Sequence, residues 1–200
     1  MPRIDLIVDA INSTLNEHLF KDERFSVAKL YGISETVIKY KDSESGAVEH
    51  ACPSIIDPNG DSHEIFPDSD IPVMVYHRLD GSVIRKAVKQ HGREASNLER
   101  LSVLKLIFVG FRDKIKVTRD QIDLAIVGVF PTSLSNESLQ KLALKNCSIN
   151  VLSSNHRSDE IYQREWPNSD KPLDPSIMIF EVTYQIGCTF DKSCINPICC

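Results

Sequence analysis

The segment VMVYHRLDGSVIRKAV, residues 73–88, decides the fold class that this sequence predicts. Two runs rich in β-branched and aromatic residues flank the dipeptide Asp80-Gly81. Asp-Gly accepts positive φ at both central positions of a two-residue turn, and the twist of that turn matches two antiparallel strands. The segment therefore predicts a β-hairpin that turns at Asp80-Gly81, and hairpins favour an α+β fold over a doubly wound α/β fold.

The segments before this hairpin predict one helix and three strands. Apolar residues recur at steps of three and four from Ile4 to Leu19, which is the period of an amphipathic helix. Residues 27–31 and 35–41 are rich in β-branched and aromatic residues and predict two strands, and residues 47–56 predict a third. Residues 57–71 combine prolines, a glycine and several acids, so we expect a long acidic loop there.

The segments after the hairpin predict two helices and a buried strand. Ser96 and Glu99 have the spacing of a capping box, and an apolar stripe follows them as far as Phe111. We therefore expect a central helix over this stripe that packs on the sheet. The apolar run 122–130 predicts a buried strand, and residues 136–146 predict another helix.

Three further strands are predicted near the end of the chain, over residues 148–154, 159–166 and 177–190. In the last of them apolar and polar residues alternate, which is typical of a strand with one solvated face. Together the segments predict a mostly antiparallel sheet with β-hairpins, packed against two or three amphipathic helices. We expect one α+β domain over residues 1–190, with 57–71 as an inserted loop and 191–200 as a cysteine-rich tail.

The composition suits a globular protein with a sizeable core. The chain has 200 residues, of which 42% are hydrophobic and 26% charged. Its net charge of −5 argues against a free-standing nucleic-acid-binding protein, which normally presents a basic surface. Asp5 and Asp9 interrupt the first apolar run, and no stretch approaches the ~20 apolar residues of a membrane span. We therefore expect a chain without a signal peptide or membrane contact, made in a cytoplasm where thiols stay reduced.

The segment CTFDKSCINPICC, residues 188–200, holds four of the six cysteines. Zinc sites use C-x₂₋₄-C pairs, and the gap between Cys188 and Cys194 is longer, whereas that between Cys194 and Cys199 fits. A zinc site, a disulfide formed after export, and a tail without a cofactor all stay open. We predict the last, with Ile195 and Ile198 as contacts to a partner.

No sequence motif of a catalytic site is present. The chain contains no H-E-x-x-H, G-x-S-x-G, P-loop or G-x-G-x-x-G pattern. His50 and Cys52 lie two residues apart in a predicted strand and share a face, which is compatible with a Cys–His pair. Cys52 and Cys147 are otherwise typical of small buried hydrophobic residues. We predict a protein that is not an enzyme and holds no cofactor, with the Cys–His pair as the alternative.

A cluster of large residues lies in the segment EIYQREWP, residues 160–167. Tyr162 and Trp166 share a face of the predicted strand, and Arg164 lies between them. The pair could face the core. Trp, Tyr and Arg are also the residues that most often anchor subunit contacts, so we assign Tyr162, Arg164 and Trp166 to an interface.

The order of these elements resembles that of tail-terminator, tail-completion and neck ring proteins of tailed bacteriophages. The resemblance rests on the opening helix MPRIDLIVDAINSTLNEHL, the central helix after a β-hairpin, and the terminal pair EIYQREW and IMIFEVTYQIGC. The opening helix, the hairpin and the final pair of strands are also similar to structural proteins of crAss-like phages. The acidic segment 57–71 and the cysteine-rich end depart from the pattern.

The resemblance implies a virion structural protein without catalytic activity at the head–tail joint. Such a subunit would form a hexameric or dodecameric ring, contact portal, neck or tail proteins, and surround the channel for DNA ejection. An acidic channel wall fits this role, because it lets DNA pass without sequence-specific binding. The alternatives are a small enzyme or metal-binding protein, and an interaction module that adds a strand to a partner.

Overall fold

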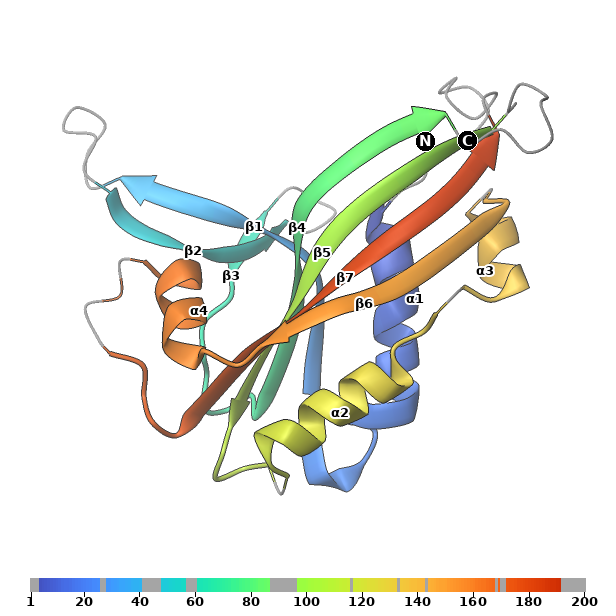
Figure 1. Ribbon diagram of the computed structural model, residues 1–200. Coiled ribbons are helices and arrows are strands. Elements are labelled where there is room, and N and C mark those ends of the chain that lie inside the picture. Colours follow the sequence, from blue (N-terminus) through green and yellow to red (C-terminus); the bar gives the residue numbers. More distant parts are fainter. Residues whose placement is uncertain are drawn as a thin grey trace.

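The computed structural model confirms the α+β class (Figure 1). It describes residues 4–25, 28–40, 48–56, 61–86, 97–115, 117–132, 134–142, 144–167, 169 and 172–191. The helices are α1 (Ile4–Leu15), a π-helical turn (Asn16–Phe20), a 3₁₀ turn (Glu23–Phe25), α2 (Arg119–Val129), α3 (Asn136–Lys141) and α4 (Ser158–Glu165). The strands are β1 (Ala28–Tyr40), β2 (Val48–Ile56), β3 (Ser62–Glu64), β4 (Val73–Lys86), β5 (Asn97–Phe111), β6 (Asn146–Asn155) and β7 (Ile177–Asp191).

The strands form one sheet in the order β3-β2-β1-β4-β5-β7-β6. β1 and β4 run parallel, and the other described pairs are antiparallel. β1 changes partner along its length: it pairs with β4 as far as Ser34 and with β2 from Glu35 onward. As a result β1, β2 and β3 bend away, while β4, β5, β7 and β6 continue as a long curved ribbon (Figure 1).

Hydrophobic side chains fill both faces of the ribbon. On one face, α1 buries a stripe at Ile7, Val8, Ile11 and Leu15, which packs with α2 over the stacked rings of Phe108 and Phe180, 4.7 Å apart. On the other face, Ile161 and Trp166 from the α4 region pack on the sheet. The strand residues of this second core are Cys52, Met74, Tyr76, Ile107, Val109, Phe111, Ile177 and Ile179.

The predicted central helix over residues 98–111 is wrong, because this segment is strand β5. β5 lies between β4 and β7, and its residues 106–111 are buried on both faces, so the side chains there are apolar on both sides. A strand of this kind carries no alternation of apolar and polar residues. The spacing from Leu98 to Phe111 therefore also matched a helical stripe.

The predicted two-residue turn at Asp80-Gly81 is also wrong. Leu79 pairs with Leu104 and Gly81 with Val103, so Asp80 is an extra residue in an unbroken strand. This is a β-bulge, for which short polar and glycine residues are as suitable as they are for a turn. β4 and β5 do pair antiparallel, but the chain connects them through residues 87–96, which lie outside the described residues.

Two predicted strands are helices in the structure. Residues 122–130 fall largely in α2, whose Thr118 and Gln121 form a reciprocal capping box, and residues 159–166 fall largely in α4. Only Ile122 and Ile126 of α2 are buried, as one stripe on a helix. The strands predicted over 27–31 and 35–41 are one continuous strand, β1.

The predicted opening helix and the strands over 148–154 and 177–190 are confirmed. The helix predicted over 136–146 is confirmed in its first half, because α3 ends at Lys141. The expected loop 57–71 contains the short strand β3, and its residues 57–60 lie outside the described part of the chain.

Gly110 in β5 leaves no room for a side chain. A Cβ atom there would lie 2.7 Å from Cδ1 of Ile115 and 2.7 Å from Cε1 of Phe108. We expect Gly110→Ala to lower the free energy of unfolding by about 1–3 kcal/mol, because both neighbours belong to a packed core. Gly81→Ala is the matched control, since nothing lies within 4 Å of its Cβ position. Equal losses for the two variants in urea denaturation would contradict this steric account.

Candidate functional site

Helix α4 places a buried carboxylate against the sheet. Glu165, at the end of α4, accepts a hydrogen bond from the hydroxyl of Tyr76 at 3.2 Å. Its carboxylate also lies 3.4 Å from Nε of Arg78 and 2.9 Å from Nε of Arg164. Burial, and then the charge of Glu165, raise the pKa of the Tyr76 hydroxyl well above its usual value. Tyr76 is therefore a hydrogen-bond donor at neutral pH.

Arg164 connects this carboxylate to a second one. Its Nη2 atom lies 2.7 Å from Oε2 of Glu181 on β7, and Asn155 donates to Oε1 of the same residue at 3.4 Å. Partial burial lowers the pKa of the Arg164 guanidinium, but its hydrogen bonds to Glu181 and Glu165 outweigh this effect and raise it. The network Arg78–Glu165–Arg164–Glu181 therefore fastens α4 to β4 and β7.

An open cleft of about 460 Å³ lies beside this network, where β1 leaves β4. Arg78, Lys105 and Arg164 contribute its positive charges. Arg78 donates to Thr36 at 2.6 Å, and Lys105 lies 3.6 Å from Asp80. Each of these cations has a partner within the protein. We therefore interpret the residues around the cleft as a structural network and not as a binding site for a charged ligand.

Of the predicted interface residues, Tyr162 and Arg164 lie on α4 and Trp166 follows directly after it. Trp166 is buried, and its indole donates to the carbonyl of Ile65 at 2.9 Å. The ring centroids of Tyr162 and Trp166 are 5.3 Å apart, and the hydroxyl of Tyr162 is 2.8 Å from that of Ser169. Arg164 belongs to the ion network. Trp166 thus occupies the second core of this single chain, and a role of the cluster at an interface stays a prediction.

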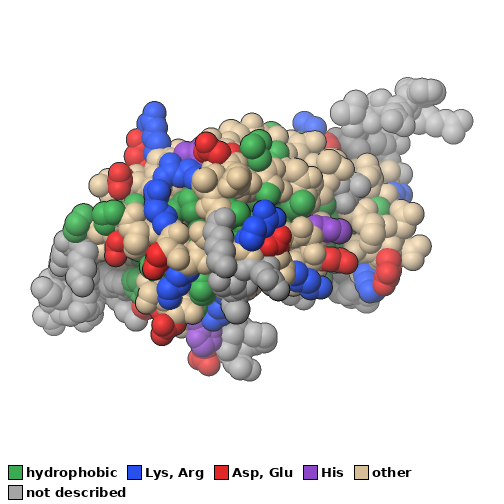
Figure 2. Space-filling model, turned by 90° about the horizontal axis from the view of Figure 1, so that it is seen from below, with side chains coloured by type: hydrophobic (Ala, Val, Ile, Leu, Met, Phe, Trp, Pro, Cys, Tyr) green, Lys and Arg blue, Asp and Glu red, His purple; other side chains and the backbone are tan. Residues whose placement is uncertain are grey.

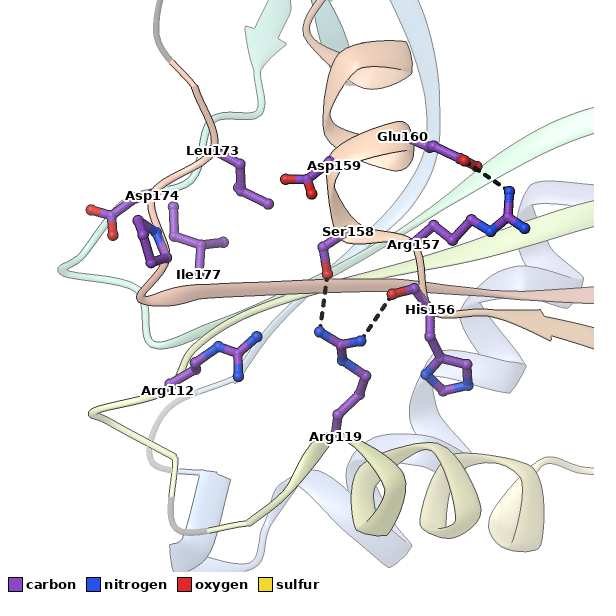
Figure 3. A pocket seen from close by; sticks show the side chains of 11 residues that line it. Arg112, Arg119, His156, Arg157, Ser158, Asp159, Glu160, Leu173, Asp174 and Ile177 are labelled. Atoms are coloured by element: carbon purple, nitrogen blue, oxygen red, sulfur yellow. Dashed lines mark hydrogen bonds and ion pairs between the residues drawn. The ribbon is translucent and has the colours of Figure 1, made fainter.

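A second cleft, of about 800 Å³, lies between the starts of α2 and α4 (Figure 3). Figure 3 shows Arg119 pointing up toward Ser158 and the carbonyl of His156, with Arg112 to the left of it in this view. Arg119 donates to the carbonyl of His156 at 2.9 Å and lies 3.4 Å from the hydroxyl of Ser158. The three arginines of the lining are balanced by three carboxylates, those of Asp159, Glu160 and Asp174. On the face seen in Figure 2, basic and acidic side chains are likewise intermingled.

His156 also belongs to a Ser–Asp–His arrangement that differs from a catalytic triad. Asp123 accepts from the hydroxyl of Ser154 at 2.9 Å and lies 3.1 Å from Nε2 of His156. In a nucleophilic triad the serine bonds to the imidazole, which acts as its base. Here the carboxylate of Asp123 stands between the two, so among the described residues the serine–imidazole bond of a nucleophilic triad is not formed.

A chain of polar side chains crosses the first core. The hydroxyl of Tyr184 lies 2.7 Å from Nδ1 of His77, whose Nε2 lies 2.8 Å from Oδ1 of Asn12. Asn12 in turn donates to the carbonyl of Tyr31 at 2.8 Å. Burial lowers the pKa of His77 from 6.5 to about 3, so the imidazole is neutral. The chain connects α1 with β1, β4 and β7.

The structure describes three of the cysteines for which the sequence predicted a role. Cys52 and Cys147 are buried, as predicted. Cys188 is buried too, whereas Cys194, Cys199, Ile195 and Ile198 lie outside the described residues, as does the side chain of His50. Among the residues that the structure describes, no group of three or more metal-ligating side chains comes together. The zinc site and the Cys–His pair therefore stay untested.

The far half of β4 is an exposed edge of the sheet. Beyond Arg78, no described strand pairs with this side of β4, because β1 has turned toward β2. Val83 is 62% exposed and Ile84 44%, and Leu79 is exposed beside the bulge. On the opposite edge, β6 presents the exposed Leu152 at a register shift, and its Ile149 N–H is bonded to the carbonyl of Thr132.

Comparisons with known proteins leave the family open. Neither the scan against models of protein families nor the comparison with curated proteins gives a match. Within the described part of the chain, no helix has both the length and the apolar character needed to span a membrane. A proposal for the function therefore rests on the structure of the chain and on its sequence.

Proposed function

We propose that this chain is a self-assembling structural subunit that forms a ring at the head–tail joint of a tailed phage. The observation that supports this most is the exposed apolar edge of β4 at Leu79, Val83 and Ile84. Exposed apolar edge strands promote association, whereas bulges and charged residues weaken it. Here the bulge at Asp80 and the exposed Arg85 flank two of the apolar residues, which remain exposed between them. An edge of this kind fits a second copy of the chain as its occupant.

The two edges of the ribbon suit head-to-tail assembly. β4 lies at one side of the strands β4-β5-β7-β6 and β6 at the other, so one copy offers both halves of a contact. A contact between two different surfaces of the same chain is heterologous, and repeating it closes a ring when the rotation allows.

The virion role rests on the resemblance in element order and on the acidic balance of the chain. The self-compensated clefts also favour a structural protein over an enzyme. A coding sequence for a portal or tail protein beside that of this chain would support the role. Metabolic genes on both sides would contradict it while leaving self-assembly intact.

We expect Val83→Glu to abolish assembly while changing the free energy of unfolding by less than ~0.5 kcal/mol, because Val83 is solvent-exposed. A charge on a sheet edge opposes strand pairing. Ile56→Glu is the matched control, since Ile56 is an exposed apolar residue on β2, outside the ribbon. Analytical ultracentrifugation over a range of concentrations measures the assembly state. A wild-type chain that stays monomeric throughout would overturn the proposal.

Mixing two variants tests the head-to-tail arrangement. Val83→Glu leaves the β6 edge intact, and Leu152→Glu leaves the β4 edge intact. If the contact is head-to-tail, the mixture forms heterodimers and no rings, while each variant alone stays monomeric. A contact that joins β4 to β4 would instead let Leu152→Glu dimerise alone, and would contradict the ring.

A further inference from the structure

Two buried cysteines face each other across β6 and β7. Cys147 pairs directly with Cys188 in the antiparallel register, and their Sγ atoms are 2.7 Å apart. Directly opposed residues of antiparallel strands have Cα atoms about 4.5–5.5 Å apart, and a disulfide requires about 4.4–6.8 Å. The sulfur atoms are already close to the S–S bond length of about 2.05 Å. The register and the sulfur contact therefore place the two cysteines within reach of a disulfide bond.

We propose that Cys147 and Cys188 are a modification site, at which a small-molecule disulfide such as oxidised glutathione converts the two thiols into a cross-strand disulfide. The bond would fasten the edge strand β6 to β7. It would also close a loop between residues 41 positions apart in the sequence. This inference rests on the register and the sulfur contact, and does not depend on the proposed ring.

The reaction is a thiol–disulfide exchange in two steps. The Cys147 thiolate attacks one sulfur of oxidised glutathione, which breaks the S–S bond, forms a mixed disulfide and releases one glutathione thiolate. The Cys188 thiolate then attacks the Cys147 sulfur and releases the second glutathione. The two thiol protons leave with the two glutathione molecules, so two thiols are oxidised and one disulfide is reduced.

The closed sheet keeps this reaction slow. A hydrogen bond with Cys147, and then burial, raise the pKa of the Cys188 thiol far above its ordinary value. The attacking species is the thiolate, so exchange requires the first residues of β6 to lift from β7. Cys147 is the second residue of β6, at the edge of the sheet, where such opening is easiest. We therefore expect reduced thiols in a reducing cytoplasm and closure under sustained oxidation.

Peptide mapping of the full-length chain tests the proposal. The folded protein is incubated with excess oxidised glutathione, blocked with iodoacetamide, and digested with trypsin. Cleavage at lysine and arginine places Cys147 in peptide 146–157, Cys188 in peptide 165–192, and the three last cysteines in peptide 193–200. The expected product is peptide 146–157 joined to peptide 165–192, at two hydrogens less than their summed mass.

Cys52 is the matched control, because it is buried but contacts the hydroxyl of Ser54 at 3.8 Å instead of a second thiol. Its peptide, 42–78, should be recovered unlinked. Cys147→Ser should abolish the link, and oxidation should raise the melting temperature of the wild-type chain by roughly 5–15 °C. Two outcomes would overturn the proposal: Cys188 linked to peptide 193–200, or peptides 146–157 and 165–192 still unlinked when peptide 193–200 is oxidised.

Discussion

The free energy of unfolding should fall by about 1.4 kcal/mol for each pH unit between pH 6.5 and about 3, as a contribution of His77 alone. Above pH 6.5 the imidazole is neutral in both states and adds no pH dependence. Below pH 6.5, His77 is protonated in the unfolded chain, whereas in the folded chain it stays neutral down to about pH 3. The unfolded state binds more protons in this window, so acid favours unfolding. The whole effect is roughly 4–5 kcal/mol.

The surroundings of His77 explain why it stays neutral in the folded state. The imidazole is 0% exposed, and its contacts among the described residues are Asn12 and Tyr184, neither of which carries a negative charge. The Asn12 oxygen accepts from Nε2, so Nδ1 is the acceptor for the Tyr184 hydroxyl. Protonation at Nδ1 would remove this acceptor and bury an unpaired charge.

Carboxylates also titrate in this range, so the measurement is a difference between variants. Urea denaturation of the wild type and of His77→Gln is compared at several pH values between 3 and 7. The slope with pH should be shallower in His77→Gln, whatever its stability at pH 7. The control is His156→Gln, since His156 is half-buried and pairs with Asp123. Parallel curves for wild type and His77→Gln would contradict a neutral His77.

Removing the carboxylate of Glu165 should cost about 3 kcal/mol of unfolding free energy. Glu165→Ala leaves Arg78 and Arg164 without their shared buried partner and leaves the Tyr76 hydroxyl without an acceptor. We expect the lower end of the usual range for a broken buried ion pair. The reason is that side chains 22% exposed at Arg78 and 39% at Arg164 can turn toward water.

Glu160→Ala is the matched control on the same helix. Glu160 pairs with Arg157 at 2.8 Å, but both side chains are exposed, and such pairs contribute less than ~1 kcal/mol. Glu165→Gln keeps the shape and an acceptor for Tyr76 while removing the charge. Its loss in chemical denaturation should therefore lie between those of the other two variants. A Glu165→Ala chain as stable as Glu160→Ala would show that the network does not fasten α4.

The sequence predicted the fold class and the elements that have one exposed face. The opening helix and β7 are examples, although β7 is more fully covered than its alternation suggested, with even Glu181 buried. Prediction failed where tertiary packing covers both faces of a strand, because the alternation of apolar and polar residues is then missing from the sequence. Residues 106–111 of β5 are apolar on both faces, so spacing alone could not separate strand from helix there.

The helices α2 and α4 were missed for a different reason. The run 122–130 is rich in β-branched residues, which suit strands. The helix signal in the sequence was Thr118 with Gln121, a capping pair placed directly before it. In α4, the buried residues Ile161 and Glu165 are four residues apart and lie on one face of the helix. Prediction from polarity assigns an acidic residue to the surface, so this buried face was not recognised in the sequence.

The candidate site could be predicted only in its composition. Arg164 was identified as an interface anchor by residue type, but its partners Glu165 and Glu181 lie on different elements, and their meeting depends on the packing of α4 on β7. Likewise, Cys147 was assigned singly to the core, and Cys188 was considered only for its spacing to Cys194. Only the register of β6 against β7 makes them neighbours.

The position of β7 in the sheet also decides when the protein can fold during its synthesis. β6 leaves the ribosome before β7. Among the described strands, however, β7 is the one partner of β6, and β7 separates it from β5. The nascent chain therefore holds β5 and β6 with unpaired backbone groups until residues 177–191 have emerged. Strands that wait in this way are exposed to aggregation. Newly made chains should thus depend on chaperones more than a protein of this size with sequential hairpins.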